Sequence, residues 1–590
     1  MKAAVKRYRS RAAGRSDVNC SVKLKRFAAI IIATGILTTS GIPAARAAYT
    51  PPYPTLRIGL FFGSNELQSG NLQNVSGLGR GFEFGYFNGN REFVPVGAYV
   101  EDTNISMLVD RNMTWHPGDG GGAGEYREGT EGPVVVGCFH AQLDIAYNSF
   151  EEAKAVADNY EDSYVKFNSG RFIVLMGSYT TRDEANAAIA SMGTGGLVVE
   201  SGTSNTIAVV KTGTNTMLFE YDYGAGNYLG VRPLPEDDEK CETWFKGYRY
   251  RGAFQYARRD GALLTIVNYV EIEDYVGGVI QHEMSNTWPL EALKAQACCA
   301  RTYALSSIGR HGAAGADLCT EEHCQVYRGR GGSNARTDQA TEETAGMYIT
   351  YNGELCETYF SSSNGGASES CVNVWGTARP YLIGVIDPYE ADVAARIPSY
   401  NWRITYTQTE ITQRLRARGY DCATIVGMAV TRYTPTGNVL TVTMTDANGK
   451  TWPFSRRSEL ITALGVPTQH FNIGNAAWEP GGMYANDPAQ PVDTGSQYYA
   501  VGGSGQAVAV PGDTVYAITG SGSIEVLTGE DGSSAGGSSS GMVNGVFVIN
   551  GRGRGHNVGM SQWGAFSMAE YHGKDYIDII KFYYTGVEVG

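Results

Sequence analysis

The chain is organised around residues 281–303, which read Gln-His-Glu-Met-Ser-Asn-Thr-Trp-Pro-Leu-Glu-Ala-Leu-Lys-Ala-Gln-Ala-Cys-Cys-Ala-Arg-Thr-Tyr. We expect Glu283 to lie in a short polar loop just before a strong helix. Pro289 suits the first turn of that helix, because its missing N–H would have no partner there. Apolar residues then recur at helical spacing and predict one buried stripe: Leu290, Leu293, Ala297, Ala300 and Ala304. A single Glu in this position is more often a cap or a solvated charge than a catalytic group, so its role depends on the rest of the chain.

Composition narrows the class of protein. A chain of 590 residues should hold more than one domain, since domains usually span about 100–200 residues. The 76 glycines and 37 tyrosines indicate β-rich folding, long loops and surfaces that bind polar polymers. The net charge of −13 argues against a nucleic-acid partner, which would normally require a basic patch. We expect a multi-domain α+β fold.

The first 47 residues are typical of a signal peptide or an N-terminal anchor. Lys23, Lys25 and Arg26 precede an apolar run at 27–37, and Ala45-Arg46-Ala47 is a small-x-small cleavage site. The long basic lead leaves an uncleaved anchor open, although the apolar run is short for a membrane span. The sequence therefore predicts an exported protein.

Changes in composition and in the pattern of apolar residues then divide the chain into regions. We expect a β-rich region at 48–117, a Gly-rich linker at 118–124, a compact βαββαβ unit at 134–200 and connecting strands at 201–245. Residues 172–189, a strand ending in Gly-Ser-Tyr and then a helix, resemble the SPOR domain, a small peptidoglycan-binding module. A generic α+β spacer remains the alternative.

Ordered blocks between about Gly247 and Val587 share a second pattern. They include Glu273–Val279, the stretch at 283–303, Gln325-Val326-Tyr327, the Ser-x-x-Gly-Gly turn at 362–366, Trp375-Gly376, Pro380–Leu382, Gly551–Ala565 and Tyr583–Val587. Together these blocks resemble the SpoIID/LytB family, and several ordered blocks are more specific than one short motif. The resemblance defines a β-rich domain at 246–590. It is interrupted by a helix at 408–418, strands at 425–433 and 439–445, and a Gly/Ser-rich insertion at about 480–545.

The resemblance implies a reaction. Active members are lytic transglycosylases of peptidoglycan, and their catalytic glutamate matches Glu283. One carboxyl group can protonate the bond between MurNAc and GlcNAc, and then take the proton of the MurNAc C6 hydroxyl that closes a 1,6-anhydro ring. Because no water attacks, neither a second carboxylate nor a cofactor is required. Glu283 must be protonated at rest, so we expect an apolar setting such as Trp288 and Met284 to raise its pKa.

Other polar residues of the matching blocks are candidates for substrate binding. Arg301 could orient Glu283 or bind a sugar acid group, or else form a structural ion pair. Planar hydrogen-bonding groups and aromatic faces suit a saccharide, which adds Gln325, Tyr327, Ser362, His556 and Gln562. We expect Glu273 and Asp274 to be structural rather than a second catalytic pair.

The Gly-x-Gly-x-Gly-His loop at 551–556 is not a nucleotide loop, and we expect its glycines to let the backbone approach the glycan. Asn557 stands where the family usually has Gly, and Asn tolerates the left-handed conformation that such a turn needs.

Cysteines and histidines cluster ahead of the Gln-Val-Tyr block. His311, Cys319, His323 and Cys324 fall within fourteen residues, and thiolate with imidazole suits zinc. Some family members carry a His/Cys zinc site here, so the resemblance implies a structural Zn. A Cys319–Cys324 disulfide or free thiols remain alternatives. Cys356 and Cys371 flank the Ser-Asn-Gly-Gly turn and could form a disulfide across it.

The sequence thus favours an exported murein lytic transglycosylase at the cell wall or the outer face of the cytoplasmic membrane. The family resemblance implies a role in sporulation and engulfment, on glycan strands already stripped of peptide stems. It also implies an amidase and membrane components of an engulfment complex as partners. The alternative is a non-catalytic wall-binding protein, or a LytB-type enhancer of another murein hydrolase.

Overall fold

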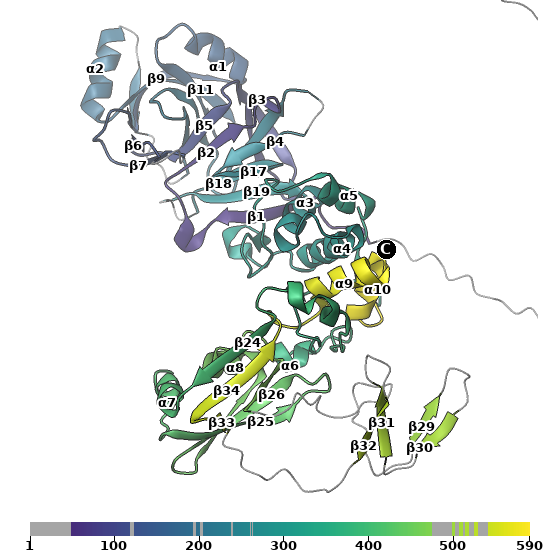
Figure 1. Ribbon diagram of the computed structural model, residues 1–590. Coiled ribbons are helices and arrows are strands. Elements are labelled where there is room, and N and C mark those ends of the chain that lie inside the picture. The colour runs from purple at the N-terminus through teal and green to yellow at the C-terminus, as the bar shows by residue number, and fades with distance from the viewer. Residues whose placement is uncertain are drawn as a thin grey trace, which may run out of the picture. The chain divides into compact units, whose positions relative to one another are not determined.

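The computed structural model describes residues 49–118, 123–192, 196–200, 205–237, 240–259, 261, 263–474 and 541–590, and four short strands between 498 and 528 (Figure 1). The expected signal segment lies outside the described residues, as do the middle of the Gly-rich linker and most of the 480–545 insertion. The short strands expected in that insertion are β29 (Tyr498–Val501), β30 (Ala507–Val510), β31 (Thr514–Ile518) and β32 (Ile524–Thr528). No helix within the described ranges is long and apolar enough to span a bilayer.

A ten-stranded sheet holds the predicted βαββαβ unit. Its strand order is β12 (Leu197–Glu200), β9 (Phe139–Tyr147), β11 (Arg171–Tyr179), β10 (Ser163–Asn168), β14 (Met217–Asp222), β13 (Ile207–Lys211), β5 (Asn104–Val109), β2 (Ser69–Asn74), β16 (Thr243–Phe245) and β17 (Tyr248–Tyr250). Helices α1 (Phe150–Ala157) and α2 (Arg182–Met192) complete the unit, and Ser149 caps α1 by accepting from the Glu152 N–H. The order β9-α1-β10-β11-α2-β12 confirms the βαββαβ prediction. That the unit is a SPOR-like glycan binder stays a prediction.

A seven-stranded sheet joins the N-terminal strands to the C-terminal half. Its order is β20 (Leu318–Cys319), β1 (Thr55–Phe61), β19 (Thr265–Glu271), β18 (Ala253–Ala257), β15 (Leu229–Pro235), β3 (Gly79–Phe87) and β4 (Phe93–Val100). Strand β1 pairs antiparallel with β19 and parallel with β20. Each sheet contains strands from both sides of residues 117, 200 and 245, where the sequence suggested domain boundaries. The expected domains are therefore not separate in the structure. Strand pairing over such distances leaves no local mark in composition.

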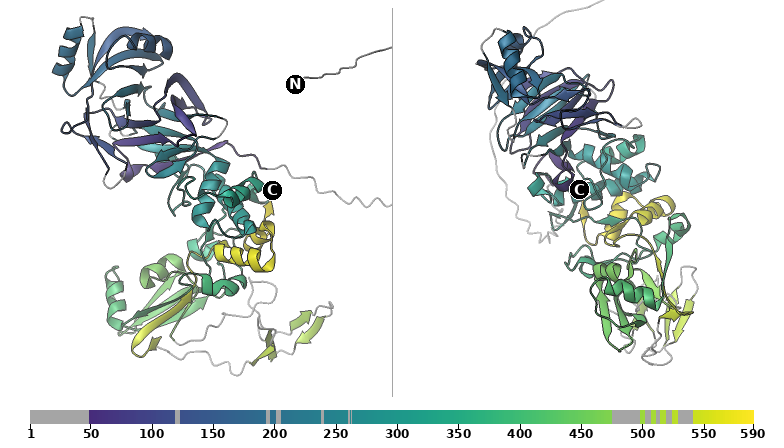
Figure 2. Two further views of the ribbon diagram at one scale, coloured as in Figure 1. Left: turned by 45° about the horizontal axis from the view of Figure 1, so that its top comes forward. Right: turned by 90° about the vertical axis from the view of Figure 1, so that its left-hand side faces the viewer.

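A group of helices follows β19. These are α3 (Ile272–Glu283), α4 (Leu290–Ser306), α5 (Ala335–Glu343), α9 (Gln562–His572) and α10 (Tyr576–Tyr583). Figure 2 shows the teal helices α3 and α4 beside the yellow helices α9 and α10, although more than 250 residues separate them in the chain. The Pro289 carbonyl starts α4. Every residue from Ala292 to Leu305 except Lys294 is buried, so burial extends beyond the single apolar stripe that was predicted.

The structure corrects the expected loop at Glu283, because Glu283 is the last residue of helix α3. The adjacent glycines Gly277 and Gly278 hid this helix, since glycine weakens a helix by about 1 kcal/mol relative to alanine. Their role is close packing. A Cβ on Gly277 would lie 2.1 Å from an Arg330 nitrogen, and one on Gly278 would lie 2.5 Å from the Tyr327 ring.

A second lobe has its own apolar core. It comprises β24 (Asn401–Tyr406), α7 (Gln408–Arg416), β25 (Ile425–Tyr433), β26 (Val439–Asp446), β27 (Thr451–Ser455), α8 (Arg456–Leu464), β28 (Phe471–Ile473) and β34 (Val546–Arg552). The predicted helix and strands at 408–445 are confirmed. A capping box between Thr407 and Glu410 starts α7. Strand β34 brings the chain back from the insertion and pairs with both β24 and β28.

Arg301 ties α4 to the start of α3. Its side chain is fully buried, and its Nη2 donates to Glu273 Oε2 at 2.6 Å while Nε donates to Oε1 at 2.9 Å. The expectation that Arg301 orients Glu283 or binds sugar is therefore wrong, and the structural ion pair is what the fold contains. Asp274 is likewise held by Arg251 and Lys240, at 3.0 and 2.7 Å, so the structural role of both acidic residues is confirmed.

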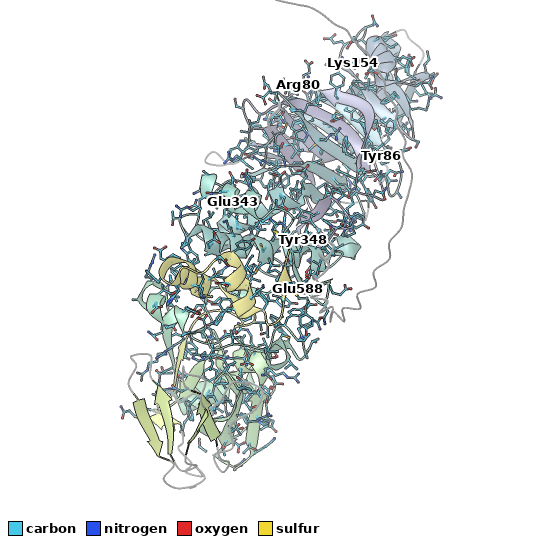
Figure 3. All side chains as sticks on the ribbon, turned by 90° about the vertical axis from the view of Figure 1, so that its right-hand side faces the viewer. Arg80, Tyr86, Lys154, Glu343, Tyr348 and Glu588 are labelled. Atoms are coloured by element: carbon cyan, nitrogen blue, oxygen red, sulfur yellow. The ribbon has the colours of Figure 1, made fainter. Side chains whose placement is uncertain are left out.

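Replacing Glu273 by Ala should destabilise the protein by about 3 kcal/mol, because it leaves a buried guanidinium without its counter-charge. Chemical denaturation of the full chain measures the loss. Asp158→Ala is the matched control, since Asp158 pairs with the surface residue Lys154 (labelled in Figure 3) and both side chains are more than half exposed. That change should cost no more than about 0.5 kcal/mol. Equal effects of the two substitutions would contradict the assignment.

Candidate functional site

Glu283 lies in the wall of a cavity of about 780 Å³, a volume within the usual range of about 300–1,000 Å³ for ligand sites. Two donors hold its carboxylate. The Val326 N–H donates to Oε1 at 3.0 Å, and the Gln562 side-chain amide donates to Oε2 at 3.3 Å. Gln562 is the first residue of α9, 279 residues after Glu283. The site therefore forms only when the end of α3 and the start of α9 come together in the fold.

Burial raises the pKa of Glu283 above that of an ordinary Glu. The Val326 and Gln562 hydrogen bonds oppose this shift, and the negative charge of Glu322 adds to it. The expected direction is confirmed, but the expected neighbours are not among the residues lining the cavity. Trp288 packs instead against Trp563 and Phe566, with ring centroids 4.6 and 5.1 Å apart, and Met284 is buried in the core.

Three of the predicted binding residues line the cavity beside Glu283: Ser362, His556 and Gln562. Gln325 and Tyr327 do not. The Gln325 amide donates to the Ala300 carbonyl at 3.2 Å, and the Tyr327 hydroxyl donates to Asn268 at 3.0 Å. Both are buried and anchor the segment whose Val326 N–H reaches Glu283. Their prediction as substrate ligands is corrected to a positioning role, and Arg301, as described above, lies in the core.

Two buried carboxylates that the sequence did not reveal support this wall of the site. Glu390 accepts from Ser363 Oγ and from the Asn364 and Gly365 N–H groups at 2.7, 2.7 and 2.9 Å, and also from Ser561 Oγ. Burial and the nearby charge of Asp387 raise the pKa of Glu390 to about 7. Glu390 thus joins the turn that carries Ser362 to the start of α9, which carries Gln562.

Asp387 completes this support. It accepts from the Asn364 amide at 2.8 Å and from the Tyr583 hydroxyl at 2.6 Å. No local pattern marks either acid in the sequence, because residues 387–390 read Asp-Pro-Tyr-Glu, which is also typical of an exposed turn. Only the tertiary fold shows that they are buried.

The glycine-rich C-terminal loop packs against the Ser-Asn-Gly-Gly turn. A Cβ on Gly553 would lie 2.5 Å from the Gly365 nitrogen, and one on Gly555 would lie 2.5 Å from the Ser361 Cβ. These glycines therefore serve loop-to-loop packing. Because Gly555 also lines the cavity, the expectation that the loop lets its backbone approach the glycan stays a prediction. Asn557 has φ = 64°, the left-handed conformation expected from sequence, and its amide donates to the Asn364 carbonyl at 2.9 Å.

The four predicted metal ligands come together at the edge of the cavity. The ligand atoms of His311, Cys319, His323 and Cys324 all lie within 4.8 Å of one another. Cys324 Sγ is 3.4 Å from His311 Nε2 and 3.7 Å from His323 Nδ1, and Cys319 Sγ is 3.9 Å from His323 Nδ1. Both cysteines are free thiols, so the disulfide alternative does not occur in this structure.

The predicted Cys356–Cys371 disulfide is also absent, since both residues are free thiols. Cys371 begins the short helix α6 (Cys371–Trp375) and does not continue a strand, so no strand pairing brings it to Cys356. Its Sγ donates to the Thr377 carbonyl at 3.0 Å.

Two further carboxylates, Glu322 and Glu357, line the same cavity. Neither residue was expected from the sequence to lie near Glu283. Glu357 is held by Arg379, whose Nη2 lies 2.8 Å from Oε1, and by the Tyr359 hydroxyl at 3.2 Å. Glu322 is exposed. The cavity thus offers one buried carboxyl group with a raised pKa at Glu283, a half-buried carboxylate at Glu357 that is paired with Arg379, and an exposed one at Glu322.

Comparison with known proteins agrees with the resemblance drawn from the sequence blocks. Residues 260–351 match the family model described as SpoIID, Stage II sporulation protein. This match includes Glu283, the metal-ligand cluster and Val326, and it ends before Ser362.

Longer matches come from individual relatives. The chain is 29% identical over 344 residues to an uncharacterised protein of Brachyspira hyodysenteriae, covering 58% of this chain and 73% of that protein. It is 27% identical to the stage II sporulation protein D of Bacillus subtilis, covering 55% and 75%. It is 28% identical to the amidase enhancer of the same organism, covering 52% of this chain and 39% of the enhancer.

Removing the Gln562 amide should raise the pKa of Glu283 further, because that hydrogen bond favours the ionised carboxylate. The Gln562→Ala variant, labelled with carbon-13 at glutamate carboxyls, tests this by NMR titration. Gln339→Ala is the control, since Gln339 pairs with Glu343 on the exposed face of α5. An unchanged or lower pKa of Glu283 in Gln562→Ala would show that the amide does not act on this carboxylate.

Proposed function

This chain belongs to the SpoIID/LytB family, and we propose that it is a peptidoglycan lytic transglycosylase. It would cleave the MurNAc–GlcNAc bond of stem-free glycan strands and leave 1,6-anhydro-MurNAc ends. The observation that carries the proposal is the setting of Glu283: a buried carboxyl group with a raised pKa, held by two donors in the wall of a sugar-sized cavity. The family match and the relatives named stage II sporulation protein D support a sporulation-related role at the cell wall.

The proposed reaction needs one proton donor that also acts as a base. Glu283 gives its proton to the glycosidic oxygen as the bond to the MurNAc C1 breaks, and positive charge develops on the sugar ring. The ionised Glu283 then removes the proton of the C6 hydroxyl, whose oxygen bonds to C1. Both carboxylate oxygens accept a hydrogen bond, Oε1 from Val326 at 3.0 Å and Oε2 from Gln562 at 3.3 Å, so Oε2, which has the longer contact, is the oxygen that would exchange the proton. The same two donors stabilise the carboxylate between the two steps.

A hydrolase is the main catalytic alternative, since Glu322 could activate a water on the other side of the sugar. The two reactions leave different ends on the glycan: a 1,6-anhydro ring for a transglycosylase and a reducing end for a hydrolase. Glu357 is the weaker candidate for such a base, because its carboxylate is already engaged by Arg379 and by the Tyr359 hydroxyl.

The Glu283→Gln variant should lose at least about 100-fold in strand cleavage, the typical contribution of a general acid–base group, while still binding glycan. Glu322→Gln is the matched control and should keep its activity. Digestion of stem-free glycan followed by mass spectrometry measures both. Anhydro-MurNAc ends support the proposal. Reducing ends that depend on Glu322 would identify a hydrolase, and unchanged strands with the wild-type protein would rule out catalysis.

A non-catalytic role is the second candidate, and the similarity to a protein named amidase enhancer favours it. In that case, the cavity would bind glycan, and an amidase would be the partner whose activity increases. Under either function, we propose an exported protein at the cell wall or the outer face of the cytoplasmic membrane that works with an amidase and membrane components of an engulfment complex. The 134–200 unit would add glycan affinity if it is a SPOR-like domain.

We also propose that His311, Cys319, His323 and Cys324 hold a structural zinc ion. Zinc bonds of about 2.0–2.3 Å to four tetrahedral ligands place those ligands roughly 3.3–3.8 Å apart, close to the spacing of the side chains here. Four protein ligands leave no open position, so the ion would stabilise structure and take no part in the chemistry. It would fix the segment that leads to Val326, and so the donor to Glu283.

Metal analysis of the purified chain should find one zinc per molecule, and Cys319→Ser should lose the metal and lower the melting temperature, because metal binding adds to folding stability. Cys422→Ser, which changes a buried thiol of the second lobe, is the control for loss of a thiol alone. A Cys319–Cys324 disulfide found by mass spectrometry, or a chain purified under zinc-replete conditions without metal, would contradict the proposal.

A further inference from the structure

We propose that Arg457 and Arg554 form an anion-binding subsite of the Glu283 cavity, which recognises the free carboxylate of an N-acetylmuramic acid unit that has lost its peptide stem. This inference rests on the proposed function. It names the chemical group of the substrate, the free lactyl carboxylate, that the cavity would recognise. Arg457 lies outside every matching block of the sequence, and Arg554 lies inside the Gly551–Ala565 block but was not among the candidate binding residues.

Four guanidinium groups line the cavity, and two of them have partners that account for their charge or position. Arg379 pairs with Glu357, and Arg310 donates to the Tyr303 hydroxyl at 3.2 Å and to His323 at 3.4 Å. Among the described residues, no ion pair includes Arg457 or Arg554. The hydrogen bond of Arg457 goes to a neutral acceptor, the Pro467 carbonyl, at 3.3 Å.

The positive charge of Arg457 lowers the pKa of a residue that lines the cavity, His556. Burial lowers the pKa of Arg457 to about 10, so its positive charge is held at a cost in solvation. Burial and the Arg457 charge together lower the pKa of His556 to about 4, which keeps that imidazole neutral near pH 7. The positive charge on this wall therefore comes from guanidinium groups, and a ligand carboxylate would offset the cost of burying one.

Arg457 and Arg554 reach the cavity from two segments that are far apart in the sequence. Arg457 enters from the second lobe, at the start of α8, where the preceding Arg456 has φ = 62° in the left-handed region that non-glycine residues rarely adopt. Helix α8 packs on α6, and a Cβ on Gly376, just after α6, would lie 3.0 Å from an Arg456 nitrogen. Arg554 comes from the glycine-rich loop, where its backbone pairs with Ser363. Three segments far apart in sequence thus meet at one wall.

An aromatic face for a sugar ring lies on the same wall. Trp375, the last residue of α6, lines the cavity and is 46% exposed. Its ring centroid is 5.1 Å from that of His556 and 4.7 Å from that of Tyr359. Aromatic faces bind the apolar side of a saccharide, so a ring stacked on Trp375 would have guanidinium groups in the same cavity for an acidic substituent.

The chemistry of the substrate explains why such a subsite would be selective. In a peptide-bearing strand, the lactyl carboxyl group of MurNAc is part of an amide and carries no charge. Removal of the stem leaves a carboxylate, which a guanidinium binds with two parallel charge-assisted hydrogen bonds. Because the chain carries a net charge of −13, an anionic strand also needs a local positive site to overcome the overall repulsion.

Binding by the full chain carrying Glu283→Gln tests the subsite without requiring cleavage. The probes are stem-free glycan strands and the same strands with lactyl carboxyls converted to methylamides. We expect at least about tenfold tighter binding of the carboxylate form, and loss of that preference in Arg457→Gln/Arg554→Gln, as two charge-assisted contacts are removed. Arg457→Lys should restore part of it, since lysine keeps the charge but cannot bind with two parallel bonds.

Arg432→Gln is the control, because Arg432 is an exposed arginine of β25 in the same lobe and does not line the cavity. It should keep the full preference, and circular dichroism establishes that each variant is folded. Equal binding of the two probes by the parent protein, or an unchanged preference in the double variant, overturns the subsite. Arginine-dependent preference in a protein that never cleaves strands would instead refute only the transglycosylase. Anhydro ends formed without preference would refute only the subsite.

Discussion

The site depends on one constraint: a carboxylate buried at the end of α3 must be held by donors that the chain can supply only from distant segments. Val326 donates a backbone N–H and Gln562 a side-chain amide. Burial favours the protonated acid, whereas these two bonds favour the carboxylate. A group of this kind changes protonation readily, which is what an acid that must also act as a base requires. Much of the surrounding architecture serves to keep these three groups in register.

Buried residues behind the two donors hold Val326 and Gln562 in position. On one side, buried Gln325 and Tyr327 fix the segment of Val326 to α4 and β19. On the other side, Glu390 and Asp387 bind the Ser-Asn-Gly-Gly turn and the first turn of α9 into one unit. Burying an acidic side chain is unfavourable, and several hydrogen bonds to each of these two residues offset that cost. Residues that resemble substrate ligands in the sequence therefore act, in part, by holding others in place.

The N-terminal strands are part of this support. Asp317 is fully buried and accepts from Arg57 at 2.9 Å and from Arg91 at 2.8 Å. Its neighbour strand β20 carries Cys319 and pairs with β1. Removing the N-terminal half would expose β19 and leave Asp317 without its two arginines, so a chain cut at residue 245 would lose interactions that hold the cysteine and histidine cluster. This half of the protein therefore contributes to the candidate site as well as to any binding of its own.

By itself, the sequence determined what short-range chemistry controls: the helix after Pro289, the βαββαβ order at 139–200, the strands of the second lobe and the left-handed turn at Asn557. Glu283 became the candidate acid through the family resemblance, since a lone Glu before a helix is more often a cap. The sequence also brought together the four metal ligands, because they lie close in the chain. Only the tertiary structure decided which polar residues face the cavity. Arg301, Gln325 and Tyr327 are buried in the core, whereas Arg457, Arg554 and Trp375 reach the cavity wall. The physical reason is that burial and charge pairing depend on contacts across hundreds of residues, and no local pattern records them.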